Sequence, residues 1–286
     1  MKNTVFDIDH TLCAVRSLHD AATGYERLGF TVSPISHITQ MGIANHVILF
    51  PPLTEGSANY IELMGTTDLA AVSPVMAEVL KGPPGIRSMV LSGDDVRGFE
   101  QHVKTLGFQR TMIADIERTW ELPSGEVLEP SFSVMLPLQS EFLFNYCQFH
   151  NIAPYKHEAW LDHANGAKSF SAILSIAENP VETSAKYAGI LGCEVTKGQA
   201  GTYLIGPGKV KMRVGSKEAM TAYLPSIFIE GSQEKNRYLG LSIDVEDISK
   251  TADFFKEQQI DYAPKGDSLF VYNLALIHIS EPTRPY

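Results

Sequence analysis

The chain has 286 residues, of which 44% are hydrophobic and 20% charged, and its formal net charge is −10. This composition is typical of a folded globular protein of one or two domains and excludes a disordered chain. The acidic balance and the scattered Lys and Arg residues argue against a nucleic-acid partner, and no apolar run approaches the roughly 20 residues of a membrane helix. Widely spaced cysteines and the polar N-terminus predict a cytoplasmic protein with buried thiols.

Three predicted helices have the same ending. The segments 21–30, 99–108 and 184–193 each carry apolar residues at helical spacing and then the dipeptide Leu-Gly. A glycine at this place favours the left-handed conformation that ends a helix. A fourth, weaker copy follows at 248–262, where Gln259 stands in place of the glycine. The sequence therefore contains an internal repeat.

Each predicted helix follows a strand-like run, at residues 5–15, 88–91, 170–176 and 238–245. Three further strand candidates follow each of the first three helices. The repeated unit is thus a strand, a helix and three strands (βαβββ). We predict an α+β protein of four such units in two lobes, with the last unit incomplete.

Loop-like segments divide these units and set the expected domain boundaries. We expect a first lobe at 1–152, made of units 1–84 and 85–152, and a second, C-terminally truncated lobe at 168–274. The last residues, 275–286, continue no helix or strand pattern and resemble the translated read-through of a sequencing adapter. We expect an artefactual tail there; a genuine irregular tail is the alternative.

Several short motifs carry a family resemblance. They are Ile8-Asp9-His10, the Glu-Arg-Leu-Gly-Phe ending at Phe30, Tyr-Ile-Glu-Leu at 60–63, Cys-Gln-x-His at 147–150 and His-x-Asn-Gly-Ala at 163–167. With the βαβββ units, they resemble the vicinal oxygen chelate superfamily, and more narrowly its glyoxalase-like family (glyoxalase, bleomycin resistance and dioxygenase type). The resemblance implies paired units whose curved mixed sheets enclose a cleft, often with a divalent metal on the sheet floor.

Metal ligands can be proposed from the same strands. His10 lies on the first strand of the first unit and Glu62 on its last strand. Imidazole and carboxylate groups suit Zn, Mn, Fe, Ni or Co, and the superfamily's enzymes use this order of His and Glu. The second unit has Ser88 where a second His is expected. There we align Gln148 with Glu62, and His150 shares the face of Gln148. The predicted ligands are His10, Glu62 and His150, with Gln148 as a further candidate.

Structural roles compete with these assignments. His10 could be a hydrogen-bonded histidine at a strand end. Glu62 lies in an apolar strand, where an unpaired carboxylate would be costly to bury, and this favours a specific role. Asn45, Trp160 and His163 are predicted to line the cleft and bind substrate, because a few polar groups on an aromatic floor suit a small molecule.

Two functions from different classes follow. The first is a metal-dependent lyase, isomerase or dioxygenase acting on a small oxygenated molecule, with Glu62 as a metal ligand or general base. The second is a metal-free protein that sequesters a small aromatic or antibiotic-like ligand. A structural protein with a vestigial cleft is a third possibility, and a homodimer is left open. In the second lobe Ser171 and Lys211 or Arg213 stand where ligands would, so we expect no metal there.

Overall fold

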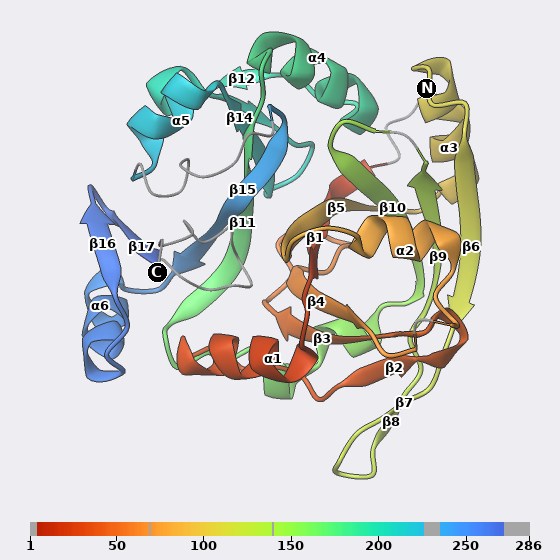
Figure 1. Cartoon of the computed structure of the whole chain (residues 1–286), viewed down its shortest axis with the longest axis horizontal. Coiled ribbons are helices and arrows are strands. Elements are labelled where there is room, and N and C mark those ends of the chain that lie inside the picture. The colour runs from red at the N-terminus through yellow and green to blue at the C-terminus, as the bar shows by residue number, and fades with distance from the viewer. Residues whose placement is uncertain (1–4, 69, 139, 226–234, 272–286) are drawn as a thin grey trace.

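The structure is a computed structural model that describes residues 5–68, 70–138, 140–225 and 235–271. Two curled sheets form the molecule, and helices lie around them (Figure 1). The first sheet has eight strands in the order β2-β3-β4-β1-β5-β10-β9-β6. These strands are β1 (Val5–Ala14), β2 (Ser36–Ile38), β3 (Ile43–Leu49), β4 (Tyr60–Thr66), β5 (Gly85–Gly93), β6 (Thr111–Glu117), β9 (Ser131–Pro137) and β10 (Leu143–Asn151).

The second sheet has five strands in the order β12-β13-β14-β11-β15. Two hairpins, β7–β8 and β16–β17, stand apart from both sheets. The remaining strands are β7 (Trp120–Glu121), β8 (Val127–Leu128), β11 (Ala167–Ile176), β12 (Thr196–Lys197), β13 (Tyr203–Ile205), β14 (Lys211–Gly215), β15 (Arg237–Val245), β16 (Tyr262–Lys265) and β17 (Ser268–Val271). The predicted α+β class with curved mixed sheets is confirmed.

Four helices occupy the predicted places: α1 (Leu18–Arg27), α3 (Val96–Thr105), α4 (Pro180–Leu191) and α6 (Ile248–Glu257). The glycines that follow the first three take positive φ angles, +87° at Gly29, +99° at Gly107 and +63° at Gly192. Gln259 adopts φ +54° at the same place after α6. The backbone conformation of the fourth helix end is therefore kept without the glycine that usually permits it. Two shorter helices, α2 (Pro74–Leu80) and α5 (Lys217–Tyr223), were not predicted.

A single hydrophobic cluster runs beneath both sheets. It includes Tyr25 of α1, Phe99 of α3, Phe170 of β11 and Tyr187 of α4, all fully buried. Asn59 joins the two sheets directly, because its side chain accepts from the main-chain N–H of Phe170 and donates to the carbonyl of the same residue, each at 2.9 Å. The two sheets thus share one core, and the boundaries at 1–152 and 168–274 stay predictions.

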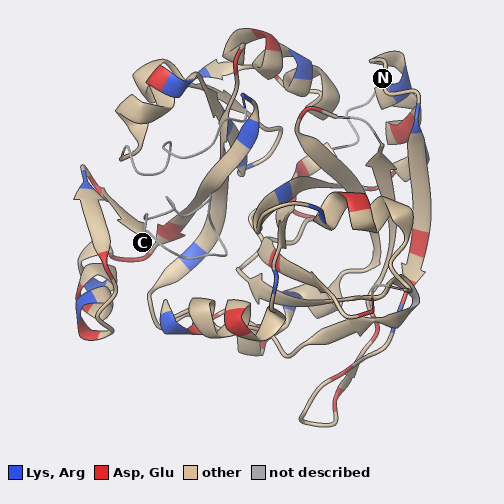
Figure 2. Cartoon of the chain, in the orientation of Figure 1, with Lys and Arg blue, Asp and Glu red and all other residues tan. Residues whose placement is uncertain are grey.

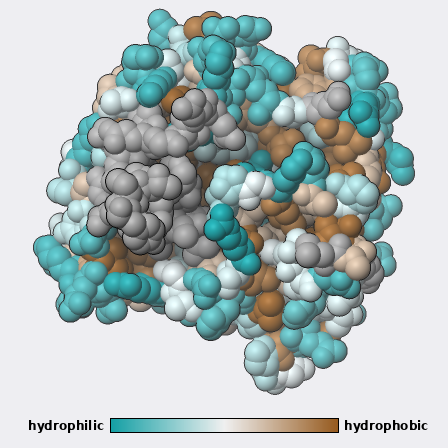
Figure 3. All heavy atoms as spheres, in the orientation of Figure 1, coloured by the Kyte–Doolittle hydropathy of each residue, from teal (hydrophilic) through white to brown (hydrophobic). Residues whose placement is uncertain are grey.

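The surface of the molecule is mixed in charge and hydropathy. Acidic and basic residues are scattered over both sheets and their helices (Figure 2). On the face shown in Figure 3, hydrophobic residues gather mainly over the first sheet. None of the helices in the described part of the chain is both long and apolar enough to cross a membrane.

Candidate functional site

The inner face of the first sheet, opposite α1 and α3, brings His10 and Glu62 together. Strands β1 and β4 are parallel neighbours, with His10 opposite Tyr60 and Leu12 opposite Glu62. Side chains two residues apart share a face, and the His10 Nε2 and Glu62 Oε2 atoms lie 3.9 Å apart. His10 is 5% exposed and Glu62 8%. The predicted meeting of this imidazole and carboxylate therefore occurs in the structure; their chemical role stays a prediction.

Asp9 fixes the imidazole of His10. A bulge in β1 between Ile8 and His10 allows the two neighbouring side chains to meet. Asp9 Oδ1 lies 2.6 Å from His10 Nδ1, while its Oδ2 accepts from Ser57 Oγ at 2.9 Å and from the N–H of Ala58 at 2.5 Å. A carboxylate held by these donors accepts the Nδ1 proton, so Nε2 faces Glu62.

Tyr60 and Asn45 complete the surroundings of the pair. The Tyr60 ring stacks on His10 at 4.0 Å, with its hydroxyl 3.1 Å from Nε2. Burial raises the pKa of Tyr60 well above its usual value, so the phenol stays neutral. Asn45 Nδ2 donates to Glu62 Oε1 at 2.5 Å. Asp9 and Tyr60 thus hold the two ring nitrogens of His10, and Asn45 holds one carboxylate oxygen of Glu62.

Apolar clusters lie on either side of Glu62 along the inner face. On one side Met64 packs with Met76 and Val79 of α2. On the other, Tyr60 packs in a cluster that contains Val47, Leu49, Ala58, Trp120, Leu122, Tyr155 and Trp160. The Glu62 side chain keeps 11% exposure between them. The carboxylate is therefore largely dry but reachable.

Sequence reasoning missed Arg118, which enters this region from the connection between β6 and β7. Its Nη1 donates to Ser36 Oγ, its Nη2 donates to the Tyr155 hydroxyl at 3.3 Å, and its guanidinium lies 5.6 Å from the Trp120 ring centre. The one signal in the sequence was an arginine close to Trp120 in a predicted strand. This signal is weak, because the same pattern is common on protein surfaces.

Gln148 and His150 do not join His10 and Glu62. Gln148 Oε1 accepts from the N–H of Val96 at the start of α3, on the helix-covered face. His150 shares that face, is exposed, and lies 2.7 Å from Ser133 Oγ through Nε2. The four predicted ligands are therefore split between the two faces of the sheet, which corrects the predicted ligand set.

The strand register explains the error. Glu62 lies opposite Leu12, two residues after His10. In the second half, the residue opposite Val90, two residues after Ser88, is Asn145. Asn145 and not Gln148 is thus the counterpart of Glu62. The sequence alignment was wrong by three residues, and an odd shift moves every side chain of a strand to the other face.

Among the described residues, the strong donors that a metal ion would find here are His10 and Glu62. Ser88 and Asn145, the second-half counterparts of His10 and Glu62, are neutral, and the Ser88 hydroxyl donates to the carbonyl of Met89 at 3.0 Å. In the described ranges no three His, Cys, Asp or Glu side chains are arranged to hold a metal ion. Protein metal sites ordinarily use three or four protein ligands, so these residues do not fit a complete metal centre.

Of the three residues predicted to line the cleft, two lie on the inner face and one lies in the core. Asn45 and Trp160 lie on the inner face, with the Trp160 and Trp120 ring centres 5.0 Å apart. His163 lies in the core between Phe30 and Phe50. It accepts from the N–H of Thr31 at 3.0 Å and donates to the carbonyl of Leu49 at 2.9 Å, and burial lowers its pKa. Since main-chain groups occupy both ring nitrogens, His163 supports the fold.

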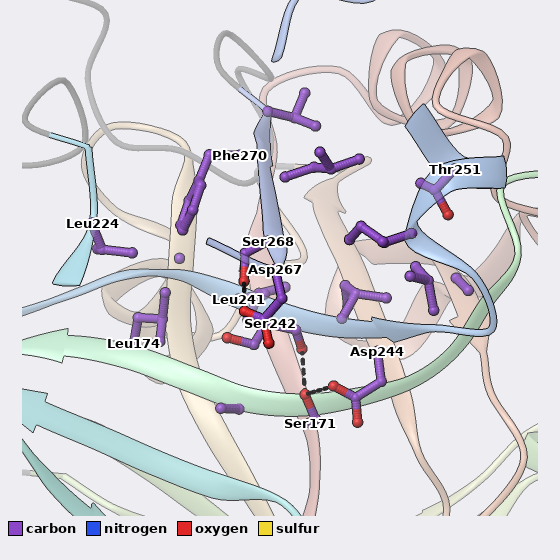
Figure 4. A pocket seen from close by; sticks show the side chains of 18 of the residues that line it. Ser171, Leu174, Leu224, Leu241, Ser242, Asp244, Thr251, Asp267, Ser268 and Phe270 are labelled. Atoms are coloured by element: carbon purple, nitrogen blue, oxygen red, sulfur yellow. Dashed lines mark hydrogen bonds between the residues drawn. The ribbon is translucent and has the colours of Figure 1, made fainter. Parts of the chain in front are cut away.

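The second sheet carries a cavity of about 650 Å³, lined by β11, β14, β15 and β17. At the positions matching His10 and Glu62 it has Ala172 and Arg213, since Leu174 lies opposite Arg213 as Leu12 lies opposite Glu62. Ser171 donates to Asp244 at 2.8 Å in this cavity (Figure 4). Arg213 stacks over Tyr223 at 4.2 Å. The second inner face thus presents a cation where the first presents a carboxylate.

Comparison with known proteins agrees with this architecture. A family model described as a glyoxalase-like domain matches residues 8–191, more than half of the chain. The chain therefore belongs to the glyoxalase-like domain family. None of the curated proteins compared with it matches the sequence.

Solved structures share the fold at low sequence identity. A hypothetical protein from Staphylococcus aureus has a TM-score of 0.57 at 10% identity, covering 73% of this chain and 85% of that one. The Mn(II)-bound glyoxalase from Novosphingobium aromaticivorans has a TM-score of 0.52 at 11% identity, covering 91% and 73%. A variant of homoprotocatechuate 2,3-dioxygenase from B. fuscum has a TM-score of 0.53 at 10% identity, covering 90% and 62%. At these identities the likeness concerns the fold alone.

Proposed function

We propose that the first sheet carries the active site of an enzyme that moves a proton within a small oxygenated molecule. The observation that carries the proposal is the pair formed by His10 Nε2 and Glu62 Oε2, 3.9 Å apart and buried. Two groups of opposite proton-transfer tendency in a largely dry site are the usual arrangement of a general acid and a general base.

In the proposed reaction Glu62 is the general base and His10 the general acid. Glu62 takes a proton from a carbon next to a carbonyl group, and protonated His10 gives one to the carbonyl oxygen, so an enol forms. Where the first carbon also bears a hydroxyl group, Glu62 returns its proton to the former carbonyl carbon while His10 takes back the proton of that hydroxyl, which completes an isomerisation without oxidant or reductant. Asp9 orients His10 and stabilises its positive charge, and the Tyr60 hydroxyl, beside Nε2, can donate to the developing oxygen charge.

Metal-dependent chemistry, as in the Mn(II)-bound glyoxalase of the same fold, is the variant that we do not adopt. His10 and Glu62 would be its ligands, but the matching second-half positions hold Ser88 and Asn145. Within the part of the chain that the structure describes, this ligand set has no third strong donor, and we route no step through a metal.

A metal-free binding protein is the second candidate. It is favoured by the stacked rings of His10, Tyr60 and Tyr155, whose successive centres lie 4.0 and 5.2 Å apart. Such a surface can hold a flat ligand without reacting with it.

Deuterium exchange tests these alternatives. Pyruvate, hydroxyacetone and 3-hydroxybutanone are incubated in D₂O with the protein and EDTA, and loss of the C–H signal is followed by proton NMR. We expect catalysed exchange of at least one compound, reduced about 100-fold or more in Glu62→Gln and His10→Gln, and unchanged in Glu78→Gln, an exposed control.

Other outcomes identify the alternatives. The metal-dependent enzyme would be established by two results together. Exchange would require added Mn²⁺, and wild type would bind one metal ion per chain, which the His10→Ala, Glu62→Ala double variant would not bind. Binding of a compound that is recovered without exchange would favour the sequestering protein.

A further inference from the structure

Arg118 is a buried cation that forms no ion pair within the described residues. The residue is 8% exposed, and none of the ion pairs formed there includes it. Taking a guanidinium out of water is unfavourable unless a negative group compensates it. An anionic ligand would supply that group.

The guanidinium is held in one orientation with donors to spare. Contacts to Ser36 and Tyr155 use two of its five N–H groups, and Trp120 lies against it. The Nε atom is buried and has no hydrogen-bond partner in the part of the chain that the structure describes. A planar fork of free N–H groups matches a carboxylate.

Aromatic contacts connect Arg118 to the reactive pair. The Tyr155 hydroxyl accepts from Arg118, and the Tyr155 ring stacks on Tyr60 at 5.2 Å. Tyr60 in turn stacks on His10. Arg118 therefore belongs to the same group of inner-face side chains as His10, although it comes from the far half of the first sheet.

Polar contacts lead from Arg118 to the same pair along a second route. Ser36, which accepts from Arg118, lies directly opposite Asn45 in the ladder between β2 and β3. Asn45 donates to Glu62, and its own Oδ1 is buried without a hydrogen-bond partner within the described ranges. A buried acceptor in this state is stabilised by a ligand that donates a hydrogen bond.

Taking the proposed acid–base role of His10 and Glu62 as given, we propose that this site takes a small hydroxycarboxylate. The carboxylate binds the free N–H groups of Arg118, and a hydroxyl donates to Asn45 Oδ1. Arg118 thereby selects a negative charge on the ligand, and Asn45 selects a hydrogen-bond donor on the same ligand. The aromatic rings beside them accept a flat or apolar body.

Tryptophan fluorescence tests the proposal on the intact chain. The two tryptophans, Trp120 and Trp160, are neighbours, and one of them touches Arg118. Wild type is titrated with mandelate, with phenylacetate (no hydroxyl), with mandelamide (no charge) and with phenyl phosphate at pH 7.5. We expect mandelate to bind at least tenfold more tightly than each of the other three.

Variants assign each preference to its residue. Arg118→Gln should remove the advantage of mandelate over mandelamide, and Arg118→Lys should keep part of it, because the charge remains without the fork. Asn45→Ala should remove the advantage over phenylacetate. Arg97→Gln, an exposed arginine of α3, is the matched control and should change nothing.

Several results would overturn the proposal. They are equal binding of mandelate and mandelamide, no response to mandelate in folded wild type, mandelate affinity kept in Arg118→Gln, or phenyl phosphate binding as tightly as mandelate. His10→Gln, which leaves the contact between Asn45 and Glu62 in place, separates this proposal from the proposed function. It should lose deuterium exchange but bind mandelate within about threefold of wild type; failure of the exchange alone leaves the ligand preference standing.

Discussion

The two sheets use one backbone plan for different inner faces. Both first strands carry a bulge at the same place, between Ile8 and His10 in β1 and between Phe170 and Ala172 in β11. The bulge residue is Asp9 in the first sheet and Ser171 in the second. Asp9 is fully buried against His10, whereas Ser171 donates to Asp244 in an open cavity (Figure 4).

This difference shows what the fold supplies and what the side chains supply. The parallel pairing of first and last strands places two positions side by side in both sheets. Those positions are occupied by an imidazole and a carboxylate in the first sheet, and by a methyl group and a guanidinium in the second. The shared architecture fixes the two positions, and the residues that occupy them decide which chemistry each face can support.

The largest expected effect comes from removing Asp9. In Asp9→Ala, the donors on Ser57, Ala58 and His10 lose a buried carboxylate acceptor. We expect the free energy of unfolding to fall by about 3 kcal/mol or more, measured by urea denaturation. Ser171→Ala, the matching change in the second sheet, should cost less than about 1 kcal/mol. Equal losses would mean that the first bulge has no special role.

Asn59→Ala tests whether the two sheets unfold together. The substitution leaves the N–H and C=O groups of Phe170 without partners in the core, so we expect a loss of about 2 kcal/mol in a single urea transition. Asn179→Ala, at an exposed helix start without a side-chain cap, is the control. Two separate transitions in wild type would contradict a shared core.

Acidification should destabilise the protein through His163. Burial lowers the pKa of His163 in the folded state, so the unfolded chain binds its proton first, near its ordinary value of about 6.5. Stability is then complete above that pH and falls as the pH drops below it. His163→Gln should flatten this slope between about pH 6.5 and 5, and His19→Gln, an exposed control, should not. An unchanged slope in His163→Gln would contradict the assignment.

Gln148→Ala should have the smallest effect. It removes one hydrogen bond to the first turn of α3, at a cost of about 0.5–1 kcal/mol in urea denaturation. Because Gln148 lies on the helix-covered face, deuterium exchange and mandelate binding should stay as in wild type. Loss of either would return Gln148 to the site.

The sequence predicted the four repeated helices and the strand before each of them, because apolar periodicity and Leu-Gly endings report local structure that tertiary contacts reinforce; it missed the short helices α2 and α5. It also predicted that His10 and Glu62 lie together on one face of the sheet, since side chains alternate between the faces of a strand and both residues are polar residues in apolar strands. It failed for Gln148 and His150, because the register between distant strands is set by pairing that no local pattern records. An error of three residues was enough to exchange the faces.

Arg118 and His163 show that local sequence does not reveal which polar residues reach the site. Arg118 reaches the inner face from a connection between strands, and nothing local distinguishes it from a surface arginine. His163 carries a residue type that suggests chemistry, yet its two nitrogens are taken by main-chain groups of Thr31 and Leu49. Only the tertiary hydrogen bonds separate the functional candidate from the structural residue.

The most direct measurement of the central pair is nitrogen NMR of the His10 ring in the uniformly ¹⁵N-labelled chain, assigned with His10→Gln. The structure predicts an Nδ1 that carries its proton toward Asp9 and an Nε2 whose chemical shift changes in Glu62→Gln and in Tyr60→Phe but not in Glu78→Gln. An Nε2 signal that is indifferent to both substitutions, or a proton found on Nε2 alone in wild type, would contradict the arrangement on which the proposed chemistry depends.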